Sequence, residues 1–235
     1  MTILDFFVKK KNKSSAIYGV EIRRSSKRSR TISLKIKDGK PILSCPNFIN
    51  DNYLRKLILK KKEWIDGNLK KKKEEIILKE NQNFPILGKL YKIKFLYSES
   101  EKTENIDNAI NIFCKKEYQM KEVFLKWLIP KSEKFLKKRI SILSKRHKLS
   151  FKDIFVKNYR SRWGCCSSDS KIFLNWKLIL MHKEIIDYVI IHELTHTLVP
   201  NHSKLFWLNV SKYDQNYKEN RKWLSRNGTK FINFG

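Results

Sequence analysis

Three residues in one short stretch have the types and spacing needed for metal chemistry. They are His192, Glu193 and His196, in the pattern His-Glu-x-x-His. Two histidines four residues apart project from one face of a helix, so both can bind the same ion. The glutamate lies beside the ion without binding it, where it can hold and deprotonate a water molecule. The pattern predicts a metal-activated water with Glu193 as general base.

A third histidine follows at a distance that completes the ligand set. Pro200 ends the predicted helix, and His202 comes six residues after His196. Three imidazoles leave a fourth position open for water, which separates a catalytic zinc from a closed structural one. Asp214 and Glu219 are the alternative third ligands, since an acid downstream can take that place. Three of the five histidines lie in this segment, which disfavours the reading that they are ordinary core residues.

Peptide hydrolysis is the reaction that this arrangement favours. A hydroxide formed at the zinc ion attacks a polarised carbonyl, and Glu193 returns the proton to the leaving amine. Hydrolysis of a non-peptide amide is also compatible with the motif. The second hypothesis is a nucleic-acid-binding protein with a mainly structural metal site, which has no need for a base beside its ligands. Imidazoles also bind Co, Ni, Cu and Fe, so zinc is a preference rather than a requirement.

The elements that must position these residues can be read from the second half of the chain. Residues 184–199 form a strongly apolar helix that carries the motif. Residues 154–156 and 172–174 are β-rich and predict an antiparallel hairpin with a long loop. A helix is expected over residues 123–143, interrupted near Pro130. Two or three helices close the chain.

The first half predicts a β-rich part with one helix. Residues 31–43 alternate around Asp38-Gly39 as a hairpin, and Asn50 or Asp51 caps a helix that runs to Leu69. Residues 91–97 predict a strand, residues 98–108 a loop, and residues 110–113 a short strand. The expected class is α+β, with a β-rich domain at 1–117 and a metallopeptidase-type domain at 118–235. The second domain is expected to combine helices with a small antiparallel sheet.

Composition bounds the remaining function classes. The 235 residues include 52 Lys and Arg and 23 Asp and Glu, which gives a net charge of +29. Apolar residues make up 41% of the chain, so it can bury a core, and no run is long enough to span a membrane. The N-terminus does not have the order of a secretory signal. Four cysteines without paired spacing predict neither disulfides nor a cysteine zinc site, so a reduced cytoplasm is expected.

The positive charge has two readings, a nucleic-acid partner or a composition rich in lysine. Residues 1–100 and 101–235 carry similar net charges of +15 and +14, which favours composition. Two local features favour DNA or another nucleic acid. Residues 118–150 hold ten basic and two acidic residues, and four of the eleven arginines cluster in one stretch, at Arg23, Arg24, Arg28 and Arg30. Clustered arginines can grip phosphates with their forked side chains.

At this point the chain resembles the YgjP-like metallopeptidase family, which is related to the SprT and Spartan group. The likeness is carried mainly by residues 160–167, 187–196, 201–207 and 217–224. It implies a minimal zincin, a helix bundle packed on a small sheet, with His192, His196 and His202 as zinc ligands and Glu193 as base. Spartan relatives act on proteins crosslinked to DNA, which by analogy suggests DNA-associated protein substrates. The oligomeric state is left open.

Residues around the motif have both a functional and a structural reading. In zincins a sheet edge lies above the metal, so residues 172–176, including Ile172 and Leu174, are candidates for pairing with an extended substrate. An ordinary core hairpin is the alternative. Arg160 and Arg162 contact substrate or phosphate, or else hold the long loop through carbonyl groups. Cys165 replaces the serine usual in the family, and Cys166 is expected to be a small buried hydrophobe.

Overall fold

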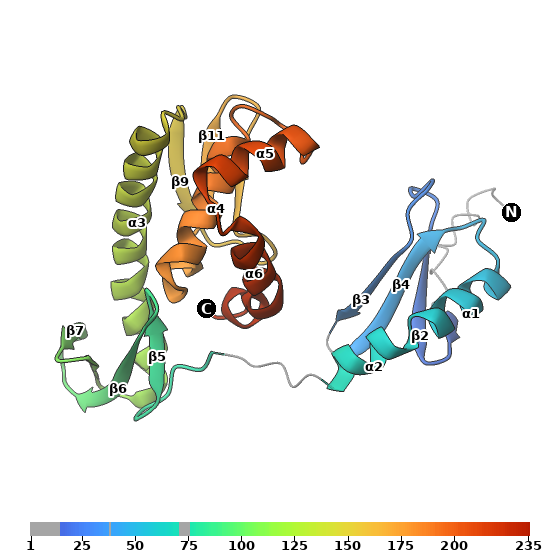
Figure 1. Cartoon of the computed structure of the whole chain (residues 1–235). Coiled ribbons are helices and arrows are strands. Elements are labelled where there is room, and N and C mark those ends of the chain that lie inside the picture. Colours follow the sequence, from blue (N-terminus) through green and yellow to red (C-terminus); the bar gives the residue numbers. More distant parts are fainter. Residues whose placement is uncertain (1–14, 38, 71–75) are drawn as a thin grey trace, which may run out of the picture. The chain divides into compact units, whose positions relative to one another are not determined.

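The computed structural model describes residues 15–37, 39–70 and 76–235. It divides into two compact units, Met1–Glu74 and Glu75–Gly235 (Figure 1). Helices and small sheets occur in both units, so the chain has the expected α+β class. No helix in the described ranges is long and apolar enough to cross a membrane.

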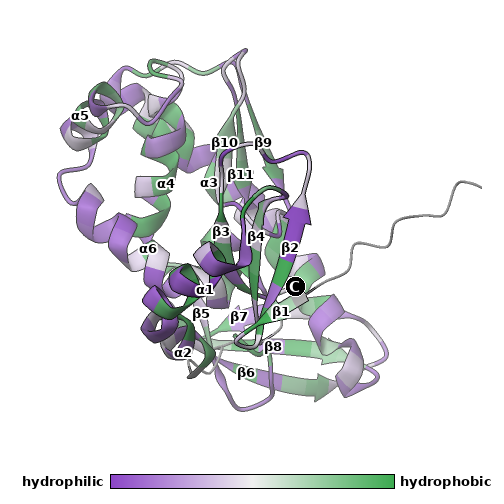
Figure 2. Cartoon of the chain, turned by 90° about the vertical axis from the view of Figure 1, so that its right-hand side faces the viewer, coloured by the Kyte–Doolittle hydropathy of each residue, from purple (hydrophilic) through white to green (hydrophobic). Residues whose placement is uncertain are grey.

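The first unit is a four-stranded sheet with two helices. Its elements are β1 (Ser15–Ile17), β2 (Val20–Ser25), β3 (Ser33–Lys37), β4 (Lys40–Pro46), α1 (Asp51–Lys60) and α2 (Lys62–Lys70). The strand order is β1-β2-β4-β3, and the expected hairpin is confirmed as β3 and β4. Asn50 caps α1 by accepting a hydrogen bond from the Tyr53 amide at 2.8 Å. The sequence predicts one helix here, but the structure has two, α1 and α2, separated at Lys61. Both helices carry hydrophilic residues (Figure 2).

The second unit holds the remaining elements. In chain order they are β5 (Asn83–Ile86), β6 (Lys89–Tyr97), β7 (Lys102–Ile106), β8 (Ala109–Cys114), the 3-10 helix η1 (Glu117–Gln119), α3 (Met120–His147), β9 (Asp153–Lys157), β10 (Gly164–Cys166), β11 (Lys171–Asn175), the 3-10 helix η2 (Trp176–Leu180), α4 (Lys183–Thr195), α5 (Lys204–Tyr213) and α6 (Tyr217–Ile232).

Strands β5 to β8 form one mixed sheet in the order β5-β6-β8-β7. The expected loop at residues 98–108 contains β7, which pairs antiparallel with β8. The turn between them is Asp107-Asn108, and both residues have positive φ, at 47° and 63°. That is the backbone of a tight hairpin turn that Asp and Asn tolerate better than most residues. Because β7 faces solvent, its residues are mostly polar, and their composition resembles that of a loop.

The boundary between units lies at residues 74 and 75, whereas the sequence changes character near residue 117. The reason is that the β5–β8 sheet shares a core with the helices that follow it. Ile93 and Ile110 are fully buried in the same cluster as Phe124 of α3. In addition, the Leu87 amide donates a hydrogen bond to the Ile179 carbonyl at 2.8 Å. The β5–β8 sheet is therefore part of the body that carries the His-Glu-x-x-His motif.

Helix α3 is continuous over 28 residues, without the expected interruption at Pro130. Pro130 is exposed. The carbonyl of Lys126, which loses its helical partner at that point, is thus on the side where water can hydrate it. The opposite side of the helix packs into the core through Val123, Phe124, Leu128, Leu136, Ile140 and Leu143.

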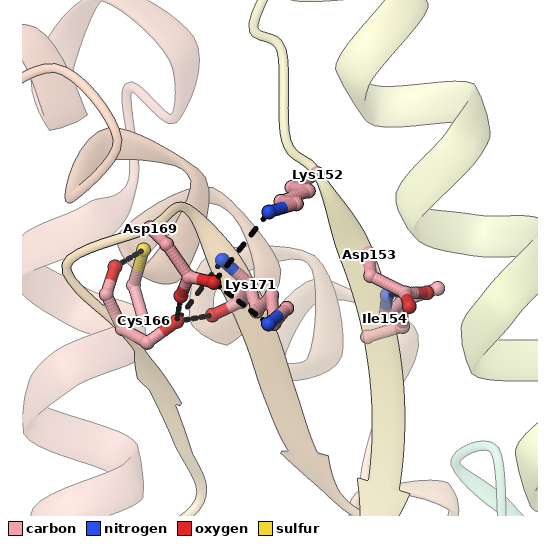
Figure 3. Close-up of polar contacts among 7 residues, drawn as sticks. Lys152, Asp153, Ile154, Cys166, Asp169 and Lys171 are labelled. Atoms are coloured by element: carbon pink, nitrogen blue, oxygen red, sulfur yellow. Dashed lines mark hydrogen bonds and ion pairs between the residues drawn. The ribbon is translucent and has the colours of Figure 1, made fainter.

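The third sheet has the order β10-β11-β9 and is mixed rather than antiparallel. Strands β9 and β11 pair in parallel, because β10 lies between them in sequence and forms the hairpin with β11 instead. The β10–β11 turn is tied by Asp169, which accepts a hydrogen bond from Ser167 Oγ at 2.7 Å and pairs with Lys171 at 2.7 Å (Figure 3). Lys171 and Ser167 lower the pKa of Asp169 to about 2.

Helix α4 is buried along nearly all its length and is mostly hydrophobic in Figure 2. Its one acidic side chain turned toward α3, Asp187, receives two hydrogen bonds from the guanidinium of Arg139, the one from Nε being 2.6 Å long. Both side chains are largely shielded, at 12% and 21% exposed. A paired, forked contact of this kind fixes direction as well as distance. It therefore sets the position of α4 against α3.

Candidate metal centre

Three histidines from α4 and the turn after it meet at one point. His192 lies in the last turn of α4, and His196 is the residue that ends the helix. His202 lies beyond the turn, just before α5 begins. One ring nitrogen from each of the three lies within 4.8 Å of the other two. The structure therefore brings together the three histidines that the sequence predicts as ligands.

The spacing of the nitrogens fits a shared ion. Nε2 of His192 and Nε2 of His202 are 3.0 Å apart. Two imidazole nitrogens on one tetrahedral zinc, each about 2.0–2.1 Å from it, are separated by about 3.3 Å. The two rings therefore face each other at the distance of two ligands of one ion. The donor set of three imidazoles is also one that zinc prefers.

Hydrogen bonding and burial keep the rings in the form that binds metal. Nδ1 of His196 lies 3.1 Å from the Val199 carbonyl, which can only accept, so Nδ1 carries the proton and Nε2 is free to bind. Burial, followed by the charges of His196 and His202, lowers the pKa of His192 to about 3. Its Nδ1 is buried and has no hydrogen-bond partner among the described residues. Neutral imidazoles are the ligand form.

Helix α5 supports the three imidazole rings through the side chain of Phe206. Phe206 is fully buried, and its ring centroid lies 4.9 Å from that of His192, 4.4 Å from His196 and 4.8 Å from His202. Ser203 caps α5 by accepting a hydrogen bond from the Phe206 amide at 3.4 Å. The cap fixes where α5 starts, and so where Phe206 lies beneath the three rings. This support depends on how α5 packs against the rings, so the sequence pattern alone does not reveal it.

Glu193 lies on the same helix as the two histidines and is nearly buried, at 6% exposed. Burial raises the pKa of its carboxyl to about 8, and the positive charge of Arg162 acts in the opposite direction. A carboxyl with its pKa near neutrality can both accept and return a proton. The residue that follows His192 is therefore a buried carboxyl whose pKa lies near neutrality.

Strand β10 covers the Glu193 side chain at Gly164. A Cβ atom at Gly164 would lie 2.7 Å from Glu193 Cγ and 2.8 Å from Oε1. Contacts that short do not occur between real side chains, so only glycine lets the carboxylate occupy this place. The sequence signal was present, as a glycine inside the motif segment 160–167, but no role was inferred for it.

The family model of the YgjP-like metallopeptidase domain matches residues 30–227. The chain belongs to the YgjP-like metallopeptidase family. Among solved structures, it is similar to the zymogens of jannalysin from Methanocaldococcus jannaschii and abylysin from Pyrococcus abyssi. Each is 18% identical to this chain, with a TM-score of 0.35. The matched region covers 39% of this chain, 94% of the jannalysin zymogen and 93% of the abylysin zymogen. No curated protein matches significantly.

Asn175, rather than Arg160 or Arg162, holds the loop before β10 through hydrogen bonds to main-chain carbonyls. Nδ2 of Asn175 donates to the carbonyls of Tyr159 at 2.9 Å and Arg162 at 3.0 Å. The side chains of Arg160 and Arg162 are exposed. Arg162 lies over the Tyr159 ring, 5.7 Å from its centroid, and its charge reaches Glu193. Of the two arginines, Arg162 is the one placed toward the site.

The sheet edge beside Glu193 is β10 rather than residues 172–176. Strand β11 is the central strand, paired on both sides. Ile172 and Leu174 are fully buried in the core, so they are not available to a substrate. Cys166, beside Glu193, is half-buried, and burial raises the pKa of its thiol to about 11. That thiol is protonated at neutral pH, which agrees with a packing role.

The arginine cluster of the first unit separates into paired and unpaired members. Arg23 pairs with Glu21 at 2.7 Å. Arg24 pairs with Asp51 at 2.6 Å and donates to two main-chain carbonyls ahead of α1, so it fastens that helix to β2. Arg28 and Arg30 have no acidic partner among the described residues. Only these last two remain as simple candidates for contact with phosphate.

Proposed function

We propose that this metallopeptidase family member is a zinc-dependent peptidase that uses Glu193 as its general base and acid. The observation that carries the proposal is the convergence of His192, His196 and His202 within 4.8 Å next to a buried carboxyl. Zinc held by these three imidazoles would supply Lewis acidity and bring the pKa of water toward about 7. That is the chemistry required to attack an amide carbonyl at neutral pH.

The residues of this chain supply the proton transfers and the orientation. The Glu193 carboxylate accepts a proton from the attacking water and donates it to the nitrogen of the leaving amine. Gly164 leaves room for that carboxylate, and burial keeps its pKa near neutrality. The outer edge of β10 is not paired with any described strand, so an extended substrate can add to it by main-chain hydrogen bonds.

Glu193→Gln tests the mechanism directly. The zinc-loaded variant should hydrolyse an unfolded protein such as casein about 10²- to 10⁴-fold more slowly, because it has lost the proton acceptor. Its zinc content should be unchanged, since the three imidazoles remain. Glu184→Gln, an exposed acid at the start of the same helix, is the matched control and should retain full activity. A Glu193→Gln variant as active as the parent would overturn the proposed mechanism.

DNA-associated substrates are a second, narrower proposal. It is supported by Arg28 and Arg30, which lack acidic partners among the described residues of the first unit. Neutralising both should weaken binding to duplex DNA and reduce its salt dependence, because fewer counterions are released. Neutralising Lys56 and Lys60, two exposed lysines of α1 in the same unit, removes the same amount of charge and is the control. Equal effects of the two double variants would assign any DNA binding to overall charge alone.

A further inference from the structure

A groove with a marked positive charge lies between α5 and α6, next to the three imidazoles. It has a volume of ≈ 610 Å³. Helix α5 lines it with Lys204, Trp207, Leu208 and Ser211, at the spacing of a single helix face. Helix α6 adds Tyr217, Lys218 and Arg221. Because regular helices supply every lining residue, the groove belongs to the fixed frame of the fold.

The groove shares a wall with the candidate metal centre. The ring centroid of Trp207 lies 5.7 Å from that of His202, with the two rings nearly parallel, and 5.8 Å from that of His192. On the groove side, Tyr217 stacks on Trp207 at 5.8 Å. The groove and the imidazole cluster therefore adjoin the same indole ring, which places the groove within a few residues' reach of a polypeptide cleaved at the imidazoles.

The charged side chains that line the groove are all positive. Its three cations, Lys204, Lys218 and Arg221, have no ion-pair partner within the described part of the chain, and no acidic residue lines the groove. Arg139, by contrast, is matched with Asp187. The guanidinium of Arg221 lies over the Trp207 ring, 4.4 Å from its centroid. That contact holds the guanidinium flat while its N–H groups remain available to a carboxylate.

We propose that the α5–α6 groove binds acidic side chains of the polypeptide substrate, next to the bond that is cleaved. The inference rests on the proposed peptidase function, since it gives the substrate its class. Three cations spread over two helices match a segment with more than one carboxylate better than a single chain end. The indole face is already occupied by Arg221 and Tyr217. That occupancy disfavours a stacked nucleobase as the occupant.

A binding experiment tests the groove without requiring turnover. Zinc-loaded full-length protein with Glu193→Gln is titrated into a labelled, C-terminally amidated peptide of alternating glutamate and glycine, and into the matching glutamine peptide. At physiological salt the acidic peptide should bind at least about tenfold more tightly, as charge-assisted hydrogen bonds require. Amidation removes the chain-end carboxylate, so binding that needs a free C-terminus instead would overturn the proposal.

Two substitutions on one helix separate the groove from the general positive charge. Arg221→Gln should weaken the acidic peptide about tenfold. Arg226→Gln removes the same charge from an exposed site of α6 outside the groove, and it should change binding less than about twofold. Lys204→Gln with Lys218→Gln leaves the Trp207 contact intact and should also weaken binding. Equal losses for Arg221→Gln and Arg226→Gln would overturn the proposal, as would preferential binding of a single-stranded oligonucleotide.

Cleavage-site mapping distinguishes failure of the groove from failure of the peptidase. Wild-type protein and the Arg221→Gln variant are incubated with casein, and the products are sequenced by mass spectrometry. Acidic residues should be enriched at a fixed distance from the cleaved bonds, and Arg221→Gln should remove that enrichment. Cleavage without acidic preference would refute the groove proposal alone. If the wild-type protein cleaves nothing, the proposed peptidase fails, and the peptide-binding data still report on the groove.

Discussion

Gly164→Ala tests whether the main chain of β10 holds the Glu193 carboxylate in place. The new Cβ would lie 2.7 Å from Cγ, 2.8 Å from Oε1 and 3.0 Å from Cδ of Glu193. Carbon atoms in contact prefer about 3.5 Å or more, so the glutamate must retreat by about 0.8 Å. The φ angle of Gly164 is outside the left-handed region. Alanine is therefore acceptable to the backbone, and the strain falls on Glu193.

The displacement predicts a large loss of turnover with little loss of metal. A shift of about 1 Å in a catalytic group costs on the order of 10²-fold in rate, so kcat should fall by about that factor. The zinc content should stay constant, because none of the atoms that crowd the new Cβ belongs to a histidine. The crowding should also destabilise the fold by about 1–3 kcal/mol.

The assay is steady-state hydrolysis of a peptide cleaved by the wild-type protein, with zinc content and urea unfolding measured in parallel. Gly67→Ala is the control, since a Cβ there meets nothing within 4 Å. Combining Gly164→Ala with Glu193→Gln should add no further loss, because the glycine acts through the glutamate. Gly164→Ala with a kcat within about twofold of wild type would refute the reasoning.

Two further predictions concern the stability of the centre. In the metal-free protein the raised pKa of Glu193, about 8, means that the folded state holds a proton that the unfolded state releases above about 4.5. Relative to Glu193→Gln, the unfolding free energy of the parent should therefore decline from about pH 4.5 to pH 8, by on the order of a few kcal/mol, in urea titrations of the two metal-free proteins; the histidines, whose pKa values are lowered, contribute equally to both, so parallel pH curves would contradict the prediction. Phe206→Ala should cost about 3–5 kcal/mol and weaken zinc binding in chelator competition, since the three imidazole rings lose the ring they pack on, with Phe206→Leu intermediate. Unchanged zinc affinity in folded Phe206→Ala would exclude that support.

The parts of the centre that depend on local geometry could be predicted from the sequence. His192 and His196 are four residues apart on a strongly apolar helix, so their shared face follows from helical periodicity. His202 follows a turn that Pro200 makes necessary, and it lies within 4.8 Å of both. In the first unit, Asn50 was recognisable as a helix cap from its type and place. In each case the deciding interactions span only a few residues.

The sequence pattern is insufficient where contacts join distant segments. The three-residue strand β10 has no detectable periodicity, so β9 and β11 were predicted as an antiparallel hairpin although they pair in parallel. Arg24 stood in a cluster suggestive of phosphate contact, yet it is bound to Asp51 and to carbonyls more than twenty residues away. The proline in α3 does not interrupt the helix, because its exposed side tolerates the lost hydrogen bond.

The sequence by itself determined which atoms could do chemistry here: two imidazoles and a carboxylate in one helical pattern, with a third imidazole just beyond it. Tertiary structure alone decided how those atoms are surrounded. Burial raises the pKa of Glu193, Gly164 of a separate strand leaves space for it, and Phe206 packs against all three rings. The α5–α6 groove likewise exists only where two helices meet. Periodicity is written in neighbouring residues, whereas burial and close contact depend on packing between segments far apart in the chain.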